Sequence, residues 1–93
     1  MVRIWIHTNI AKLADGRTEW NVEIISGRSV GEILKDVFAD RQRLLFGLID
    51  ETGTLRRHIN IFIGDSDIKR LNGLDSAVAD GCEISIFTAV SGG

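Results

Sequence analysis

The sequence of 93 residues contains no proline, and its single cysteine is Cys82. One cysteine cannot form a disulfide within the chain, and it cannot by itself hold a cysteine-ligated iron–sulfur cluster. The sequence also lacks the long apolar stretch that a membrane span needs. The first eight residues, MVRIWIHT, alternate in polarity and do not form the apolar core of a signal peptide. These features predict a cytoplasmic, reduced protein that has no membrane partner.

An excess of positive charge is missing as well, because the formal net charge is −2. The densest basic runs, at residues 41–43 and 56–58, are short and are interpreted as solvated loops. We therefore expect no nucleic-acid partner. An apolar content of 44% and a charged content of 26% are ordinary for a globular protein. The length predicts one domain over residues 1–93.

Several stretches alternate between aliphatic and polar residues, as half-buried strands do. They are residues 2–6, 20–25, 58–63 and 82–90. The first two are separated by a polar turn at Asp15-Gly16, which predicts a hairpin. A short edge strand is expected around Ile68, and residues 72–81 are expected to form a short helical turn.

One amphipathic helix is predicted after the hairpin. Ser29 followed by Glu32 forms a capping box, which marks a helix start. The apolar residues that follow have helical spacing and would share one face: Val30, Ile33, Leu34, Val37 and Phe38. The apolar segment at residues 44–49 is expected to be a partly buried turn or a short helical piece.

The order of these elements predicts an α+β fold of the β-grasp (ubiquitin-like) type, with a mixed sheet of four to five strands. One main helix would cross one face, and the first and last strands would be central, parallel neighbours. The covered face would be aliphatic: Val2, Ile4, Ile6, Ile59, Ile61, Ile63, Ile84 and Ile86. On the open face, Trp5, Phe87 and Phe62 would form an aromatic row that suits partner contact. Alternatively, residues 44–49 cover Trp5 and Phe62, which would then belong to a satellite core.

Three motifs in the second half resemble the MoaD/ThiS family of ubiquitin-like sulfur carriers, most closely its MoaD-like, CysO-type branch. They are LRRHINIFI, DIKRLNGLDSAVADG and a final strand that ends in AVSGG. The first half matches by its hairpin and helix alone. The resemblance thus covers about half of the chain by motif and the rest by architecture.

The resemblance implies a mechanism based on the C-terminus. A partner ATP-dependent, ubiquitin-activating-like adenylyltransferase would adenylate the carboxylate of Gly93, and sulfur from a separate source would convert it to a thiocarboxylate. A sulfur-accepting synthase would then use that sulfur to make cysteine or molybdopterin, or a thiazole. Gly92 and a flexible tail at about residues 90–93 would thread into the partner. Ala89, Val90, Ser91, Phe87, Phe62 and Trp5 would bind that partner.

On this interpretation the protein is a substrate of its partners and not an enzyme, with no bound cofactor. Two alternatives remain open: a ubiquitin-like modifier joined to lysines through Gly93, and a β-grasp interaction module with an inert tail. His7 and His58 would lie on strands that a third strand separates, so no metal site is expected. Cys82 is expected to be a small buried apolar residue.

Overall fold

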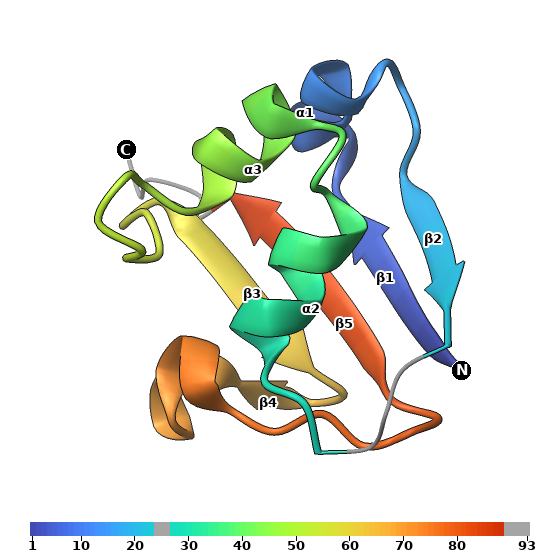
Figure 1. Cartoon of the computed structure of the whole chain (residues 1–93), viewed down its shortest axis with the longest axis vertical. Coiled ribbons are helices and arrows are strands. Elements are labelled where there is room, and N and C mark those ends of the chain that lie inside the picture. Colours follow the sequence, from blue (N-terminus) through green and yellow to red (C-terminus); the bar gives the residue numbers. More distant parts are fainter. Residues whose placement is uncertain (24–26, 89–93) are drawn as a thin grey trace.

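The computed structural model describes residues 1–23 and 27–88, which form a five-stranded sheet with helices on one face (Figure 1). The strands are β1 (Val2–Ile6), β2 (Glu19–Val22), β3 (Ile59–Ile63), β4 (Ser66–Asp67) and β5 (Glu83–Thr88). The helices are α1 (Thr8–Ala11), α2 (Val30–Val37) and α3 (Gln42–Leu48), and three short 3-10 turns are η1 (Lys12–Ala14), η2 (Ile68–Arg70) and η3 (Gly73–Asp75). No helix in this part of the chain is long and apolar enough to cross a membrane.

The strand order is β2-β1-β5-β3-β4, so the first and last strands lie at the centre of the sheet. They are parallel, with Ile4 opposite Ile84 and Ile6 opposite Ile86. β1 is antiparallel to β2, and β5 is antiparallel to β3. The predicted α+β, β-grasp architecture and the parallel central pair are therefore confirmed.

The predicted capping box begins α2. The Glu32 N–H donates to Ser29 Oγ at 3.2 Å, and the Ser29 N–H donates to Glu32 Oε1 at 3.3 Å. The helix packs closely against η3, because a Cβ on Gly31 would lie 3.1 Å from the carbonyl oxygen of Leu74. This contact fixes η3 beside the helix.

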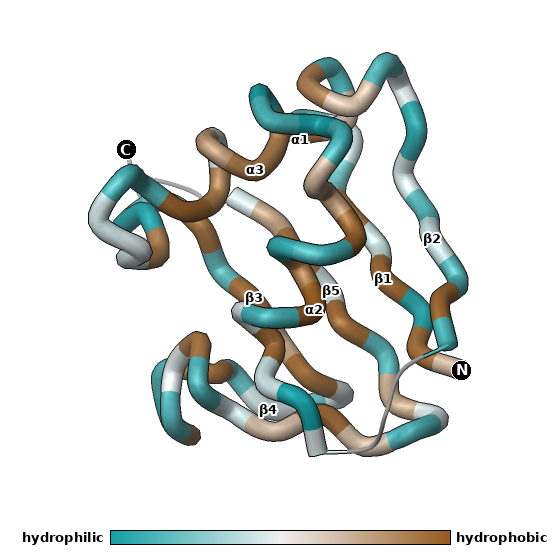
Figure 2. Tube along the Cα trace, in the orientation of Figure 1, coloured by the Kyte–Doolittle hydropathy of each residue, from teal (hydrophilic) through white to brown (hydrophobic). Residues whose placement is uncertain are grey.

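The aliphatic face of the sheet and the helices enclose the core (Figure 2). Seven of the eight aliphatic residues predicted for this face are buried, and Ile63 is half-buried. Along α2, Val30, Ile33 and Leu34 are buried as the helical spacing predicts. Phe38 contacts Trp20 of β2 in a T-shaped pair with ring centroids 5.0 Å apart, which closes the core at that side.

Two details differ from the sequence-based predictions, and a third lies partly outside the described residues. The connection between β1 and β2 is not a simple polar turn, because it contains α1 and η1 and buries Ile10 and Ala14. The edge strand ends at Asp67, and Ile68 begins η2 with its side chain fully buried. The described part of the last strand ends at Thr88, so Ala89 and Val90 lie outside the described residues.

Candidate functional site

The helices cover one face of the sheet and leave the opposite face open (Figure 1). Every second residue of the three central strands, β1, β5 and β3, lies on that open face. Hydrogen-bond register arranges them in rows across β1, β5 and β3. Arg3 lies opposite Glu83 in the first row. Ser85 lies opposite both Trp5 and Phe62 in the second, and Phe87 lies opposite Asn60 in the third.

The row at the start of β5 is charged. Arg3 forms ion pairs with Glu19 of β2 at 3.0 Å and with Glu83 of β5 at 3.5 Å. All three side chains are about half exposed, so these pairs contribute little to stability. This end of the face is therefore polar and solvated.

The end of the face near the C-terminal end of β5 is aromatic. Phe62 and Phe87 pack with ring centroids 5.4 Å apart, and Trp5 makes an edge contact with His7 at 6.0 Å. The predicted row follows the order of the strands β1, β5 and β3, but it is staggered, because Ser85 lies between Trp5 and Phe62 and Phe87 is two residues further along β5. The three aromatic residues are each half-buried and form a staggered patch, which we call the aromatic patch.

The segment at residues 44–49 packs on the other side of the sheet. Leu44 and Leu48 of α3 are fully buried in the core that the helices cover, and Phe46 is 49% exposed. Trp5 and Phe87 instead line a hollow of about 350 Å³ on the open face. The aromatic patch is thus not a satellite core beneath α3.

The aromatic patch lies where β5 leaves the sheet. Thr88, the last described residue, pairs with Ile59 at the start of β3, next to the Phe87–Asn60 pair. The other predicted site residues, namely Ala89, Val90, Ser91, Gly92 and Gly93, lie outside the described residues. The end of β5 beside Phe87 is therefore the part of the described surface that is nearest in sequence to these residues.

The two histidines and the cysteine do not form a reactive group. His7 caps α1, because its Nδ1 accepts the Asn9 N–H at 3.1 Å, and His58 is exposed before β3. Within residues 1–23 and 27–88, no three His, Cys, Asp or Glu side chains are placed to hold a metal ion. Cys82 is half-buried against the core, so the prediction of a buried residue is only partly correct.

Three carboxyl groups have lowered pKa values, each for a structural reason. A hydrogen bond from Ser29 lowers the pKa of Glu32 in the capping box. Hydrogen bonds from Thr52 and Thr54 lower the pKa of Asp50 in the turn after α3, and the N-terminal ammonium group lowers the pKa of Asp80. None of these carboxyl groups belongs to the aromatic patch, and their shifts come from a helix cap, a turn and an ion pair with the N-terminus.

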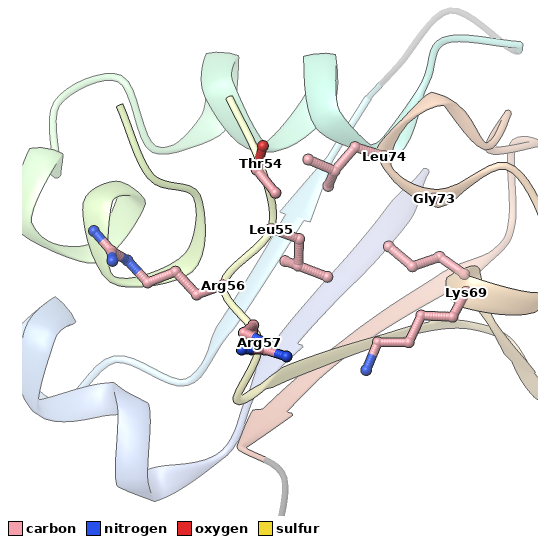
Figure 3. Close-up of a pocket in the computed structure, with 8 residues that line it drawn as sticks. Thr54, Leu55, Arg56, Arg57, Lys69, Gly73 and Leu74 are labelled. Carbon is pink, nitrogen blue, oxygen red and sulfur yellow. The ribbon is translucent and has the colours of Figure 1, made fainter. Parts of the chain in front are cut away.

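Sequence reasoning missed a pocket of about 530 Å³ on the helix side of β3 (Figure 3). Residues 54–57, which precede β3, form one wall. The other wall comes from η2 and η3 and includes Lys69 and Leu74. The two walls flank the β3–β4 hairpin in the sequence, and the basic residues 56 and 57 were the only local sign of the pocket.

Comparison with known proteins places this architecture in a family. The model of the ThiS family matches residues 9–93. The sulfur carrier protein CysO of Mycobacterium tuberculosis is 36% identical over 70 residues, which cover 73% of this chain and 75% of that protein. The small archaeal modifier protein 3 of Haloferax volcanii is 30% identical over 74 residues, or 80% of this chain and 77% of the relative.

Solved structures agree with this result. The crystal structure of the Amycolatopsis orientalis BexX/CysO complex contains a chain that matches with a TM-score of 0.84 and 30% identity, and the match covers 100% of both chains. The expected resemblance to sulfur carriers is therefore confirmed. This chain belongs to the ThiS family and is a CysO-like sulfur carrier protein within it.

Proposed function

We propose that the carboxylate of Gly93 is the group that carries sulfur. A partner enzyme would join it to AMP, with release of pyrophosphate from ATP. A sulfur nucleophile would then attack the carbonyl carbon and displace AMP, which leaves a thiocarboxylate on Gly93. The chain would act as a protein-bound substrate, and the ATP and the sulfur source would be bound by its partners.

The position of the aromatic patch carries this proposal. Phe87 lies next to the last described residue of β5 and contacts Phe62 at 5.4 Å between ring centroids. Half-exposed aromatic side chains are enriched where proteins bind one another. We infer that Trp5, Phe62 and Phe87 dock on the partner while residues 89–93 enter its active site.

The composition of the last residues suits this role. No charged side chain occurs from Ile84 to Gly93, so insertion of this segment buries no charge other than that of a terminal carboxylate. Gly92 and Gly93 have no side chain that would prevent a close approach of the partner's backbone. A narrow site of this kind also excludes water, which would hydrolyse an acyl adenylate.

The sulfur acceptor is proposed by analogy. One solved relative was crystallised as a BexX/CysO complex, and the curated relatives include the sulfur carrier CysO. We infer that this chain, in the cytoplasm, likewise supplies sulfur to a biosynthetic synthase. Synthesis of cysteine or molybdopterin is favoured, and thiazole synthesis is a further candidate.

A second function is protein modification through an amide bond between Gly93 and lysine. The observation that favours it is the 30% identity to the small archaeal modifier protein 3. The same adenylation would precede either reaction. Conjugates that carry the C-terminal peptide of this chain in the native host would support modification.

The test is a reconstituted reaction that contains the chain, its host's adenylating enzyme, ATP and sulfide. We expect pyrophosphate release and conversion of the C-terminal peptide to a thiocarboxylate. A chain that lacks Gly92 and Gly93 should give neither product and should unfold at the same temperature as the full chain. Equal pyrophosphate release from both chains would contradict the role of Gly93.

A further inference from the structure

We propose that the pocket beside β3 is a second docking site for the adenylating partner, and that it binds an acidic segment which carries an aliphatic side chain. This inference rests on the proposed function, because it concerns how the same partner is recognised. It adds a surface on the helix side of the sheet to the aromatic patch on the open side. Its residues are contributed by the segment before β3 and by η2 and η3.

The floor of the pocket is apolar. Ile68 is fully buried, and Leu55 and Leu74 are half-buried. Leu55 and Leu74 extend toward the same space from opposite walls (Figure 3). A hollow of about 530 Å³ with this lining can hold one aliphatic side chain of a partner together with part of its backbone.

The rim of the pocket is cationic. Its eight lining residues include Arg56, Arg57 and Lys69 and no carboxylate, although the whole chain has a net charge of −2. Figure 3 shows Arg57 and Lys69 along the same side of the pocket, whereas Arg56 points away from it. Arg56 Nε donates to the carbonyl of Phe46 at 2.5 Å, so its position is held by α3.

Arg57 and Lys69 are both exposed, and within residues 1–23 and 27–88 neither forms an ion pair within the protein. The nearest acidic side chain in sequence to Lys69 is Asp67, whose carboxylate accepts the backbone N–H of Lys69 at 2.9 Å. Two cations beside an apolar floor are complementary to a segment that combines carboxylates with an aliphatic residue.

Lys69 connects the pocket with the open face of the sheet around the edge of β3. Lys69 Nζ donates to Asn60 Oδ1 at 3.1 Å, and Asn60 lies opposite Phe87 on the open face. β4 pairs only with Phe62 and Ile63, which leaves this part of β3 at the edge of the sheet. One partner could therefore contact both surfaces while it holds the end of the chain.

The test compares two charge-reversed variants in the reaction with the host's adenylating enzyme. The first variant combines Arg57→Glu with Lys69→Glu. The matched control combines Lys35→Glu with Arg43→Glu, which reverses the same number of exposed charges on α2 and α3. All four substituted residues are exposed, so both variants should fold, and thermal unfolding checks this.

We expect the first variant to raise KM for the chain by about tenfold at low salt, with kcat unchanged and the salt dependence of KM reduced. The control should stay within about twofold of the unsubstituted chain, because surface charges outside an interface have small effects. Equal KM values for the two variants would overturn the pocket proposal alone. A wild-type chain that is never adenylated would overturn both this inference and the proposed function.

Discussion

At the scale of single residues, the capping box at the start of α2 links sequence, structure and pH dependence. Glu32 accepts hydrogen bonds from the Ser29 side chain at 3.0 Å and from its backbone N–H at 3.3 Å. These bonds favour the charged carboxylate and lower the pKa of Glu32 below its ordinary value of 4.5. The stabilisation is present when pH exceeds that ordinary value, and it is lost as pH falls through the lower pKa of the folded state.

Glu32→Gln should therefore reduce stability near neutral pH and make little difference in acid. Glutamine can still accept hydrogen bonds at this position, but it does so without charge. Thermal unfolding from pH 3 to 7 measures the gap between the two proteins, which should narrow as pH falls below about 4. Glu51→Gln, in the exposed turn after α3, is the matched control. A gap that does not depend on pH would contradict this account of the cap.

Residue roles were predictable where the signal is local. Ser29 and Glu32 are three positions apart, which is the spacing of a capping box, so the sequence alone predicts their contact. The role of His7 as the N-cap of α1 could not be predicted, because the sequence of residues 8–11 does not indicate a helix. The half-burial of Cys82 depends equally on packing against residues that are distant in the chain.

At the scale of elements, the sequence left two possible positions for α3. It could pack in the main core or cover Trp5 and Phe62 as part of a satellite core. The segment at residues 44–49 is apolar on almost every side, so its spacing does not choose between the two faces of the sheet. The structure places Leu44 and Leu48 in the main core. Ile68 is a similar case. Its side chain is buried in the core and it begins η2, so β4 ends at Asp67 and does not include Ile68 as the local sequence predicted.

Leu48→Ala should reduce the free energy of unfolding by roughly 3 kcal/mol, because it removes a fully buried side chain and leaves a cavity. Urea unfolding followed by circular dichroism measures the change. Phe46→Ala is the control on the same helix, and its cost should be below about 1 kcal/mol because Phe46 is 49% exposed. Equal costs for the two variants would contradict the orientation of α3.

At the scale of the whole molecule, the order of the strands gathers the aromatic side chains of the open face at one end of the sheet. The parallel pairing of β1 with β5 places Trp5 and Phe87 on the same open face, and β3 adds Phe62. Among the described residues, Arg3 at the other end of this face forms ion pairs with Glu83 of its own row and with Glu19 of β2. The strands that define the fold thereby also position the aromatic patch beside Thr88, the last described residue.

Phe62→Ala should weaken binding to the adenylating enzyme by about tenfold or more, as is typical when an aromatic residue at the centre of an interface is truncated. Calorimetric titration measures the affinity. Glu83→Gln, at the charged end of the same face, should leave the affinity nearly unchanged. Similar affinities for the Phe62 variant and the unsubstituted chain would exclude the aromatic patch from the interface.

The topology could be predicted because the order of the elements is typical of a β-grasp fold, in which the first and last strands are central neighbours. The pocket beside β3 could not be predicted from the sequence. Its two walls come together only because η3 packs on Gly31 and η2 follows the β3–β4 hairpin. Periodicity describes which face a residue occupies, whereas a pocket depends on how loops from separate parts of the chain pack. The staggered order of the aromatic patch likewise required the exact register of β5 against both neighbours.

The most direct test of the central claim is a measurement of the intact mass of the untagged protein. The protein is purified from its native host under reducing conditions and measured, and it is measured again after incubation with ATP, sulfide and the host's adenylating enzyme. We predict that the C-terminal peptide gains the mass difference between one sulfur atom and one oxygen atom, localised to Gly93. A C-terminal peptide that keeps its unmodified mass both before and after this incubation would contradict the sulfur-carrying role of Gly93.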